Sequence, residues 1–318
     1  IISYFGGIMK EKKRNLIIYL ILILITIIMC FPYLTEHYSS DDYTIIGYGY
    51  YKYGIEKFLN DGRVFSSVIT LLAGYWNLPI KVFIQGLFYI GILISCLCVI
   101  KIKNIITKIK PEKNLKETVL VLGISYCIIF NFMYLENMYF AEIPIMALGI
   151  LLFIKSSEKL VESKYLKSLA YLIIGELCYQ GTINFFITFT FLLLIIKNKG
   201  INKEVIKKVI ISGLFCLISV GINFIQIKIC GKIFGLEQIR LGGIQKIPAN
   251  ITYIMLHIGG LLTNTCDFFP KYGFLIFLLI LYITTFIYDL VKIKEYSNSF
   301  NINLSVLCSI SISKTTNR

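Results

Sequence analysis

Long runs of apolar residues, separated by short lysine-rich segments, constrain this sequence more than any other feature. Eight runs approach the roughly 20 residues that a helix needs to cross a bilayer; they are 16–34, 82–100, 118–134, 143–154, 169–178, 183–196, 209–227 and 274–291. Only 16% of the residues are charged, against about 25% in a soluble domain. The runs also lack the polar residues that a water-exposed surface needs. We therefore expect an all-α fold, a polytopic transmembrane helical bundle of about eight spans.

The lysines and arginines predict how these spans are oriented, because cytoplasmic loops retain positive charge during insertion. With the N-terminus inside, the inner segments hold 21 of these residues and the outer segments hold 9. This bias predicts an even number of spans and a cytoplasmic N-terminus, in the inner or plasma membrane of a cell. The net charge of +14 does not indicate nucleic acid, because the basic residues form short clusters rather than one continuous face.

Three regions are expected along the chain. Residues 1–14 form a cytoplasmic N-terminal segment, 15–296 a transmembrane domain, and 297–318 a C-terminal segment that we expect to be truncated. Two outer loops, about 35–80 and 228–272, are long and carry apolar residues at mixed helical spacing, as in helices that lie on the membrane interface. Function is expected in these loops.

The first outer loop carries two adjacent carboxylates directly after the outer end of a span. Asp41 and Asp42 stand where a lipid-borne head group and an aqueous acceptor would meet, and a hydroxyl nucleophile needs a base to take its proton. A structural account has about equal weight: Ser40 or Asp41 caps an interfacial helix, and the acids complement its dipole. Tyr43 could stack on a sugar or belong to an aromatic belt at the interface.

Further candidates are polar residues at the outer ends of other spans. Arg63 follows Gly62 and could hold a phosphate with two hydrogen bonds, or extend to lipid phosphates. Glu142 begins the fourth span, where a carboxylate faces a cavity or simply a solvated turn. Gln180 could bond to a sugar or to a neighbouring helix. Arg240, in the second outer loop, could neutralise a leaving phosphate or be an ordinary solvated residue.

The order of these residues resembles the bacterial glucosyltransferase family of the Gtr type, within the C-type integral-membrane glycosyltransferases. The resemblance covers residues 9–291 and rests on Ser40-Asp41-Asp42-Tyr43, Gly62-Arg63, Tyr179-Gln180 and a later outer arginine; the first two motifs are its most specific part. It implies a polyprenyl-phosphate-sugar donor, a cell-envelope glycan such as O-antigen or teichoic acid as acceptor, and acids of the first outer loop at the reaction centre. Members of the family are usually longer than this chain.

The expected function is therefore a glycosyltransferase, by default a glucosyltransferase, that works on the outer face of the membrane. Its site should combine catalytic carboxylates with groups that bind the phosphate and the sugar. The catalytic set is Asp41, Asp42 and Glu142, with Asp41 or Asp42 as the base, and the substrate-binding set is Tyr43, Arg63, Gln180 and Arg240.

No cofactor is expected for this reaction, because a lipid-phosphate leaving group needs no nucleotide-binding loop. A metal is not required, although Asp41, Asp42 and Glu142 could hold one divalent cation through oxygen ligands. Two alternatives are a polymerase or ligase of envelope polysaccharide, and a flippase or transporter of a lipid-linked sugar. A transporter should carry ionisable or helix-breaking residues near the middle of the membrane.

Overall fold

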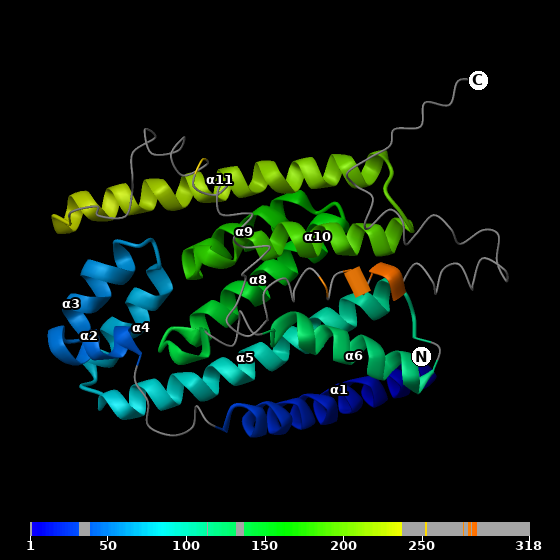
Figure 1. Cartoon of the computed structure of the whole chain (residues 1–318), viewed down its shortest axis with the longest axis horizontal. Coiled ribbons are helices and arrows are strands. Elements are labelled where there is room, and N and C mark those ends of the chain that lie inside the picture. Colours follow the sequence, from blue (N-terminus) through cyan, green and yellow to red (C-terminus); the bar gives the residue numbers. More distant parts are fainter. Residues whose placement is uncertain are drawn as a thin grey trace. The chain divides into compact units, whose positions relative to one another are not determined.

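The computed structural model describes residues 2–31, 39–112, 114–131 and 137–236, and a few residues between 252 and 284. All regular secondary structure in the described residues is helical, which confirms the all-α fold class (Figure 1). The chain divides into two compact units, Ile1–Asn198 with Asn202–Glu237, and Lys199–Ile201 with Gln238–Arg318. The helices named below belong to the first unit.

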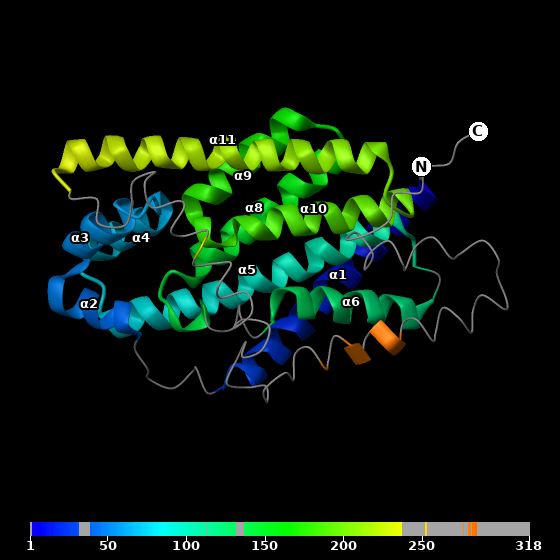
Figure 2. The same cartoon turned by 45° about the horizontal axis from the view of Figure 1, so that its top comes forward.

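Seven long helices form this bundle. They are α1 (Ile2–Met29), α5 (Ile80–Ile109), α6 (Leu115–Ile129), α8 (Ile143–Val161), α9 (Tyr165–Cys178), α10 (Ile183–Asn198) and α11 (Lys203–Phe234). The central helix, α8, packs on α5, α9 and α10, while α1 and α6 pack on α5, and α11 packs on α9 and α10 (Figure 2). The main apolar core lies where α5 meets α8, around Ile92, Val99, Ile150 and Ile154.

Local capping chemistry sets several helix ends. The side-chain oxygen of Asn114 accepts a hydrogen bond from the Glu117 N–H at 2.9 Å, and that of Asn202 accepts one from the Val205 N–H at 2.9 Å. These are the usual N-caps of a helix, here α6 and α11. Gly235, in the left-handed conformation (φ 65°), ends α11.

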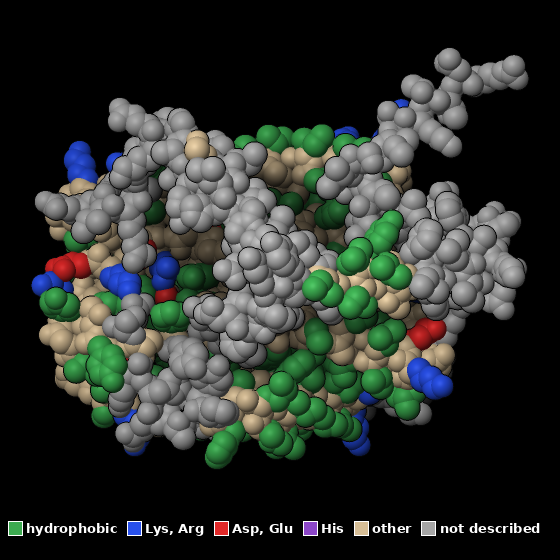
Figure 3. All heavy atoms as spheres, viewed as in Figure 1, with side chains coloured by type: hydrophobic (Ala, Val, Ile, Leu, Met, Phe, Trp, Pro, Cys, Tyr) green, Lys and Arg blue, Asp and Glu red, His purple; other side chains and the backbone are tan. Residues whose placement is uncertain are grey.

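Among the described residues, three helical segments are long and apolar enough to cross a membrane: Ile80–Ile109, Gln180–Asn198 and Lys203–Phe234. On the face shown in Figure 3, hydrophobic side chains gather between charged groups at the two ends. Many apolar side chains of α1, α6 and α11 are exposed in the isolated chain. These features suggest a bilayer environment, while eight spans remain a prediction. Most of the predicted run 274–291 lies outside the described residues.

Several helices extend beyond the apolar runs of the sequence. Residues 2–14, expected to form a separate segment, are continuous with α1, and α8 continues to Val161. α11 continues through Lys228 to Phe234, so its last turns lie within the predicted second outer loop, about 228–272. Lysine has good helix propensity, so a helix need not end where its apolar stretch ends.

Four short helices between α1 and α5 form what we call the outer segment: α2 (Ser40–Tyr48), α3 (Tyr50–Tyr53), the π-helical η2 (Gly54–Leu59) and α4 (Val64–Tyr75). The helices expected within the predicted loop 35–80 are present there. The segment packs through Ile45, Tyr53 and Phe58 against Phe83 of α5 and Ala141, just before α8. Its place is therefore the end of the bundle where α8 begins (left in Figure 1).

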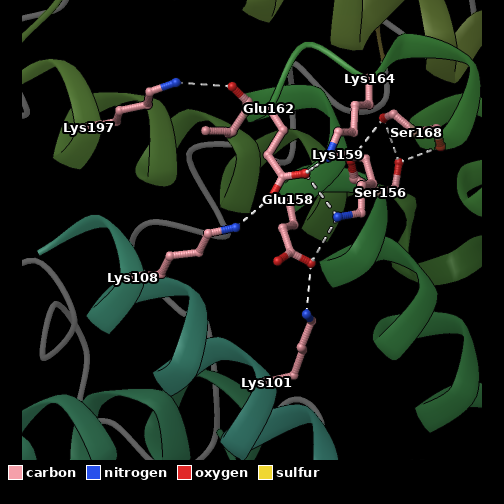
Figure 4. Close-up of polar contacts among 10 residues, drawn as sticks. Lys101, Lys108, Ser156, Glu158, Lys159, Glu162, Lys164, Ser168 and Lys197 are labelled. Carbon is pink, nitrogen blue, oxygen red and sulfur yellow. Dashed lines mark hydrogen bonds and ion pairs between the residues drawn. The ribbon is translucent and has the colours of Figure 1, made fainter. Parts of the chain in front are cut away.

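The opposite end of α8 carries a network of ion pairs that we call the lysine cluster (Figure 4). Glu158 pairs with Lys101 at 2.7 Å, and Glu162 with Lys108 at 2.7 Å. Glu162 also pairs with Lys159 and Lys164, both at 2.9 Å. Lys197 and Lys208 each donate to the carbonyl of Val161, at 3.2 and 3.1 Å. Six lysines that the charge bias assigned to one side of the membrane thus lie at one end of the bundle.

Candidate functional site

The first element of the site is Arg63, which stands in the turn between η2 and α4. Its Nη1 donates a hydrogen bond to Oε1 of Glu142, which joins the outer segment to the start of α8. The side chains are 15% and 4% exposed, respectively, so the ion pair is largely enclosed by protein. The guanidinium carbon lies 4.7 Å from the centroid of the Tyr179 ring, within the range of a cation–π contact. Arg63 is thus held between a carboxylate and an aromatic face.

Glu142 has its position because it is the residue at which α8 begins. Its carbonyl accepts hydrogen bonds from the N–H groups of Ile145 and Met146, at 2.9 and 3.0 Å. Pro144, in the first turn, is well tolerated there because the missing N–H would have no partner within the helix. The partial positive charge of a helix N-terminus favours a carboxylate. Two cationic influences, the helix end and Arg63, therefore act on this buried acid.

Two amide side chains hold the turn that presents Arg63. Gln180, at the start of the short helix η4 (Gln180–Thr182), donates to the carbonyl of Asp61. Asn223 of α11 donates to the carbonyl of Gly62 at 3.1 Å. Gly62 has φ of 81°, and a Cβ at this position would collide with the Asn223 amide. The turn therefore requires glycine both for its backbone conformation and for space.

A small cavity lies beside the ion pair. Its lining includes Glu142, Ser66, Thr70, Phe58 and Phe83, and its volume is ≈ 10 Å³. This is about the space that one water molecule needs. The Ser66 hydroxyl is buried and has no hydrogen-bond partner among the described residues. A water here would have both a hydroxyl and a carboxylate available as partners.

Asp42 has the structural role that the sequence left open. Its Oδ2 accepts hydrogen bonds from the Ser39 N–H at 2.7 Å and the Ser39 hydroxyl at 2.8 Å. The Asp42 N–H donates to Ser39 Oγ at 3.2 Å, which completes a capping box at the start of α2. The N-cap is therefore Ser39 rather than Ser40 or Asp41. This geometry supports the capping account of Asp42 and does not test a catalytic one.

The remaining predicted residues lie apart from the ion pair or outside the description. Asp41 lies in the first turn of α2, and its side chain is not among the described groups. Tyr43 is exposed on α2. Arg240 lies outside the described residues. The described groups of His, Cys, Asp and Glu include no cluster of three or more that could hold a metal ion.

Of the predicted site residues, the structure brings together Arg63, Glu142 and Gln180. Sequence reasoning did not predict that Tyr179 contacts Arg63 or that Asn223 bonds to the Gly62 carbonyl. The signal for Asn223 was available, since it is an amide within the apolar run 209–227, where polar side chains usually bond to another part of the protein. The contact of Tyr179 with Arg63 depends on tertiary structure and had no such signal.

Comparison with protein-family models, curated proteins and solved structures gives no significant match. The fold and the site therefore define a class and not a family. The chain is an all-helical protein whose apolar helices suggest a lipid bilayer environment, with a buried arginine–carboxylate site at one end of its bundle.

Proposed function

We propose that this chain is an integral-membrane glycosyltransferase that moves a sugar, by default glucose, from a polyprenyl-phosphate donor to a cell-envelope glycan on the outer face. The observation that carries the proposal is the position of Arg63 between Glu142 and Tyr179. A guanidinium that is oriented by an aromatic ring and a carboxylate is well suited to bind a phosphate group. Its location fits the expected outer side, since the lysine cluster occupies the other end of α8.

In the proposed reaction Arg63 would bind the lipid phosphate and stabilise it as it leaves. The bond between C1 of the sugar and the phosphate oxygen breaks, and its electron pair stays on the phosphate. The acceptor oxygen bonds to C1, and its proton passes to Asp41 or Asp42. Glu142 and Gln180 would shape the sugar site, with Tyr43 and Arg240 as further substrate contacts. The donor's own phosphate supplies the leaving group, so this scheme invokes no cofactor.

The direct test measures sugar transfer from a polyprenyl-phosphate donor in membranes that contain the full-length protein. Arg63→Ala should lower the rate about a hundredfold or more, the usual cost of losing a group that stabilises transition-state charge. Arg63→Lys should also be weak, because lysine lacks the planar fork and stacks less well.

Lys52→Ala is the matched control for this test. Lys52 belongs to the same outer segment, and its side chain is 50% exposed; it pairs with Glu56 at 3.9 Å and lies 4.8 Å from the centroid of the Tyr48 ring, and it has no described contact with Arg63 or Glu142. Its removal should leave transfer unchanged. Full transfer by Arg63→Ala would rule out the phosphate-binding role. If loss of the protein changes the chain length of the envelope glycans in cells but not their side-chain sugar, the result would instead indicate a polymerase or ligase.

A second candidate function, transport of a lipid-linked sugar, is favoured by Glu176 of α9. This carboxyl is buried within the bundle, and its Oε2 has no hydrogen-bond partner among the described residues. Buried ionisable groups at membrane depth are typical of transporters. Movement of a lipid-linked sugar across vesicles that contain the protein but no acceptor would support transport, and its absence would favour the transferase.

A further inference from the structure

Glu176 is an enclosed carboxyl near the Arg63 site that the proposed transfer reaction does not use. The residue is 2% exposed and lies in the last turn of α9, four residues before Gln180. Gln180 bonds to the turn that carries Arg63. Glu176 is therefore close in sequence to a residue that holds the Arg63 turn.

The surroundings of Glu176 are closely packed on the side of α8. A Cβ at the neighbouring Gly175 would meet the Phe153 ring and, at 3.3 Å, the carbonyl of Gly149. The backbones of α8 and α9 are thus in near contact beside the carboxyl. This packing excludes bulk water from that side.

Polar side chains approach the same level from α11. Leu172, one turn before Glu176, packs in one core cluster with Cys216. The next buried residue along α11 is Ser219, whose hydroxyl has no hydrogen-bond partner among the described residues. Asn223 follows one turn later and bonds to Gly62. By this register Glu176 on α9 and Ser219 on α11 stand at similar levels of the bundle, and Ser219 is one turn before the residue that bonds to Gly62.

The chemistry around Glu176 favours a proton over a larger ligand. Within the described part of the chain, no lysine or arginine forms an ion pair with Glu176. Removing an ionised carboxylate from water without a paired cation is costly, and burying the neutral acid costs much less. Neither the cavity beside Glu142 nor the one at Tyr48 is lined by Glu176. A proton needs no such space.

We propose that Glu176 is a reversible proton-binding site near the Arg63 site, and that binding of a phosphate at Arg63 is coupled to uptake of a proton by Glu176. The proton site is argued from the geometry of Glu176 alone. Its coupling to phosphate binding rests on the proposed phosphate site at Arg63. A bound phosphate adds negative charge nearby and so favours the neutral form of Glu176. Linkage requires that protonation strengthens phosphate binding by the same factor.

Other titratable or charged groups face this region from the elements packed on α9. They are Cys216 on α11, Arg63 before α4, Glu142 before α8 and Tyr179 before η4. Arg63 and Glu142 already neutralise each other in the free protein. A phosphate that replaced Glu142 at Arg63 would leave an uncompensated negative charge, which is the source of the coupling.

The first experiment labels the full chain in lipid nanodiscs with a hydrophobic carbodiimide, which reacts with protonated carboxyls, and maps the products by mass spectrometry. Label at Glu176 should be strong at mildly acidic pH and should fall as the pH rises. Glu56, whose side chain is 56% exposed, should stay unlabelled and is the comparator. Absence of label at Glu176, or label that does not vary with pH, would overturn the proton site.

The second experiment measures binding of a short-chain polyprenyl phosphate by calorimetry in buffers of different ionisation enthalpy. Wild type should take up protons on binding, and Glu176→Gln should bind without uptake. Binding to wild type without uptake would overturn the coupling. No binding at all would overturn the phosphate site and the coupling together, while the labelling result would still decide the proton site. If Glu176→Gln does not fold, the wild-type binding and labelling data decide alone.

Discussion

Arg63 Nη1 donates to Glu142 Oε1 across 79 positions of sequence, and the pair joins the outer segment to the N-cap residue of α8. Both side chains are largely enclosed, so forming the pair costs the dehydration of two charges. The attraction between them offsets this cost in the folded state. Removal of one partner leaves the other charge buried alone, and that situation is more costly than losing both.

A first prediction follows for the stability of this pair. Glu142→Gln should lower the free energy of unfolding by about 3 kcal/mol, the low end for a broken buried pair, because Arg63 keeps some exposure and its contact with Tyr179. The double variant Arg63→Met with Glu142→Gln should recover part of the loss. Thermal unfolding in detergent micelles measures both. Disruption of the exposed pair of Lys52 and Glu56 is the control. A double variant that is no more stable than Glu142→Gln would contradict this account.

A second prediction separates capping from catalysis at Asp42. Ser39→Ala removes the cap without changing a carboxylate and should cost about 1 kcal/mol of stability. If Asp42 acts only through the capping box, Asp42→Ala should lower sugar transfer no more than Ser39→Ala does. If Asp42 or Asp41 is the base, its Asn variant should lose about a hundredfold or more in transfer at unchanged stability. Transfer rates and unfolding midpoints, measured on the same membranes, decide between the two roles.

A third prediction concerns Gly62. Gly62→Ala would place a Cβ against the Asn223 amide at a positive φ, so it should destabilise the fold by about 1–3 kcal/mol. Gly213→Ala on α11 is the matched control, because its Cβ meets nothing within 4 Å. The control should be neutral or stabilising by up to about 1 kcal/mol. Equal unfolding midpoints for the two variants would show that the Gly62 turn is more adaptable than described.

A fourth prediction concerns pH and Glu162. Hydrogen bonds from Lys108, Lys164 and Lys159 hold the pKa of Glu162 well below its usual range. A carboxyl whose pKa is lower in the folded state stabilises the fold fully above its unfolded pKa, about 4.3, and loses this contribution as the pH falls below it.

The test of this linkage compares wild type with Glu162→Gln as a function of pH. The variant should be less stable at neutral pH, by on the order of 1 kcal/mol for a partly exposed network. The difference should shrink as the pH falls below about 4.3. Glu56→Gln, at an exposed position, should show little difference at any pH. A stability gap for Glu162→Gln that stays constant into acid would argue against the role of these hydrogen bonds.

A fifth prediction tests orientation in the membrane. Tyr51 of the outer segment and Leu166 at the lysine-cluster end are both exposed. In a background without the native cysteines Cys127, Cys230, Cys266 and Cys308, a cysteine at Tyr51 should react with an impermeant thiol reagent in intact cells. A cysteine at Leu166 should react only after the cells are permeabilised. The reverse pattern would place the Arg63 site on the cytoplasmic side.

The sequence predicted the fold class and most described helices because these depend on local signals. Hydropathy located α9 and α10 to within a few residues, and it ended α5 well before Ile109. It missed α4, and it ended α11 too early, because a helix that packs against its neighbours can continue through lysines. The grouping of lysines around Glu158 and Glu162 agrees with the alternation of charged segments along the chain.

The candidate site could be predicted only in part. Arg63, Glu142 and Gln180 were chosen as polar groups at the ends of apolar runs, and this reasoning requires no tertiary information. Their pairing was not predictable, because it depends on how the turn at Gly62 packs against α11. The same limit applied to Asp42, since catalytic and capping roles use the same residue types at the same spacing.

The near contact between the backbones at Gly149 and Gly175 has a mechanical consequence. With a Cβ unable to fit at Gly175, α8 and α9 interlock and cannot slide past each other without losing this contact. Glu142 and Tyr179 stand at the ends of these two helices, so they form a fixed frame. Any widening of the Arg63 site would then have to come from the turn at Gly62, which the Gln180 and Asn223 amides hold, rather than from sliding of α8 against α9.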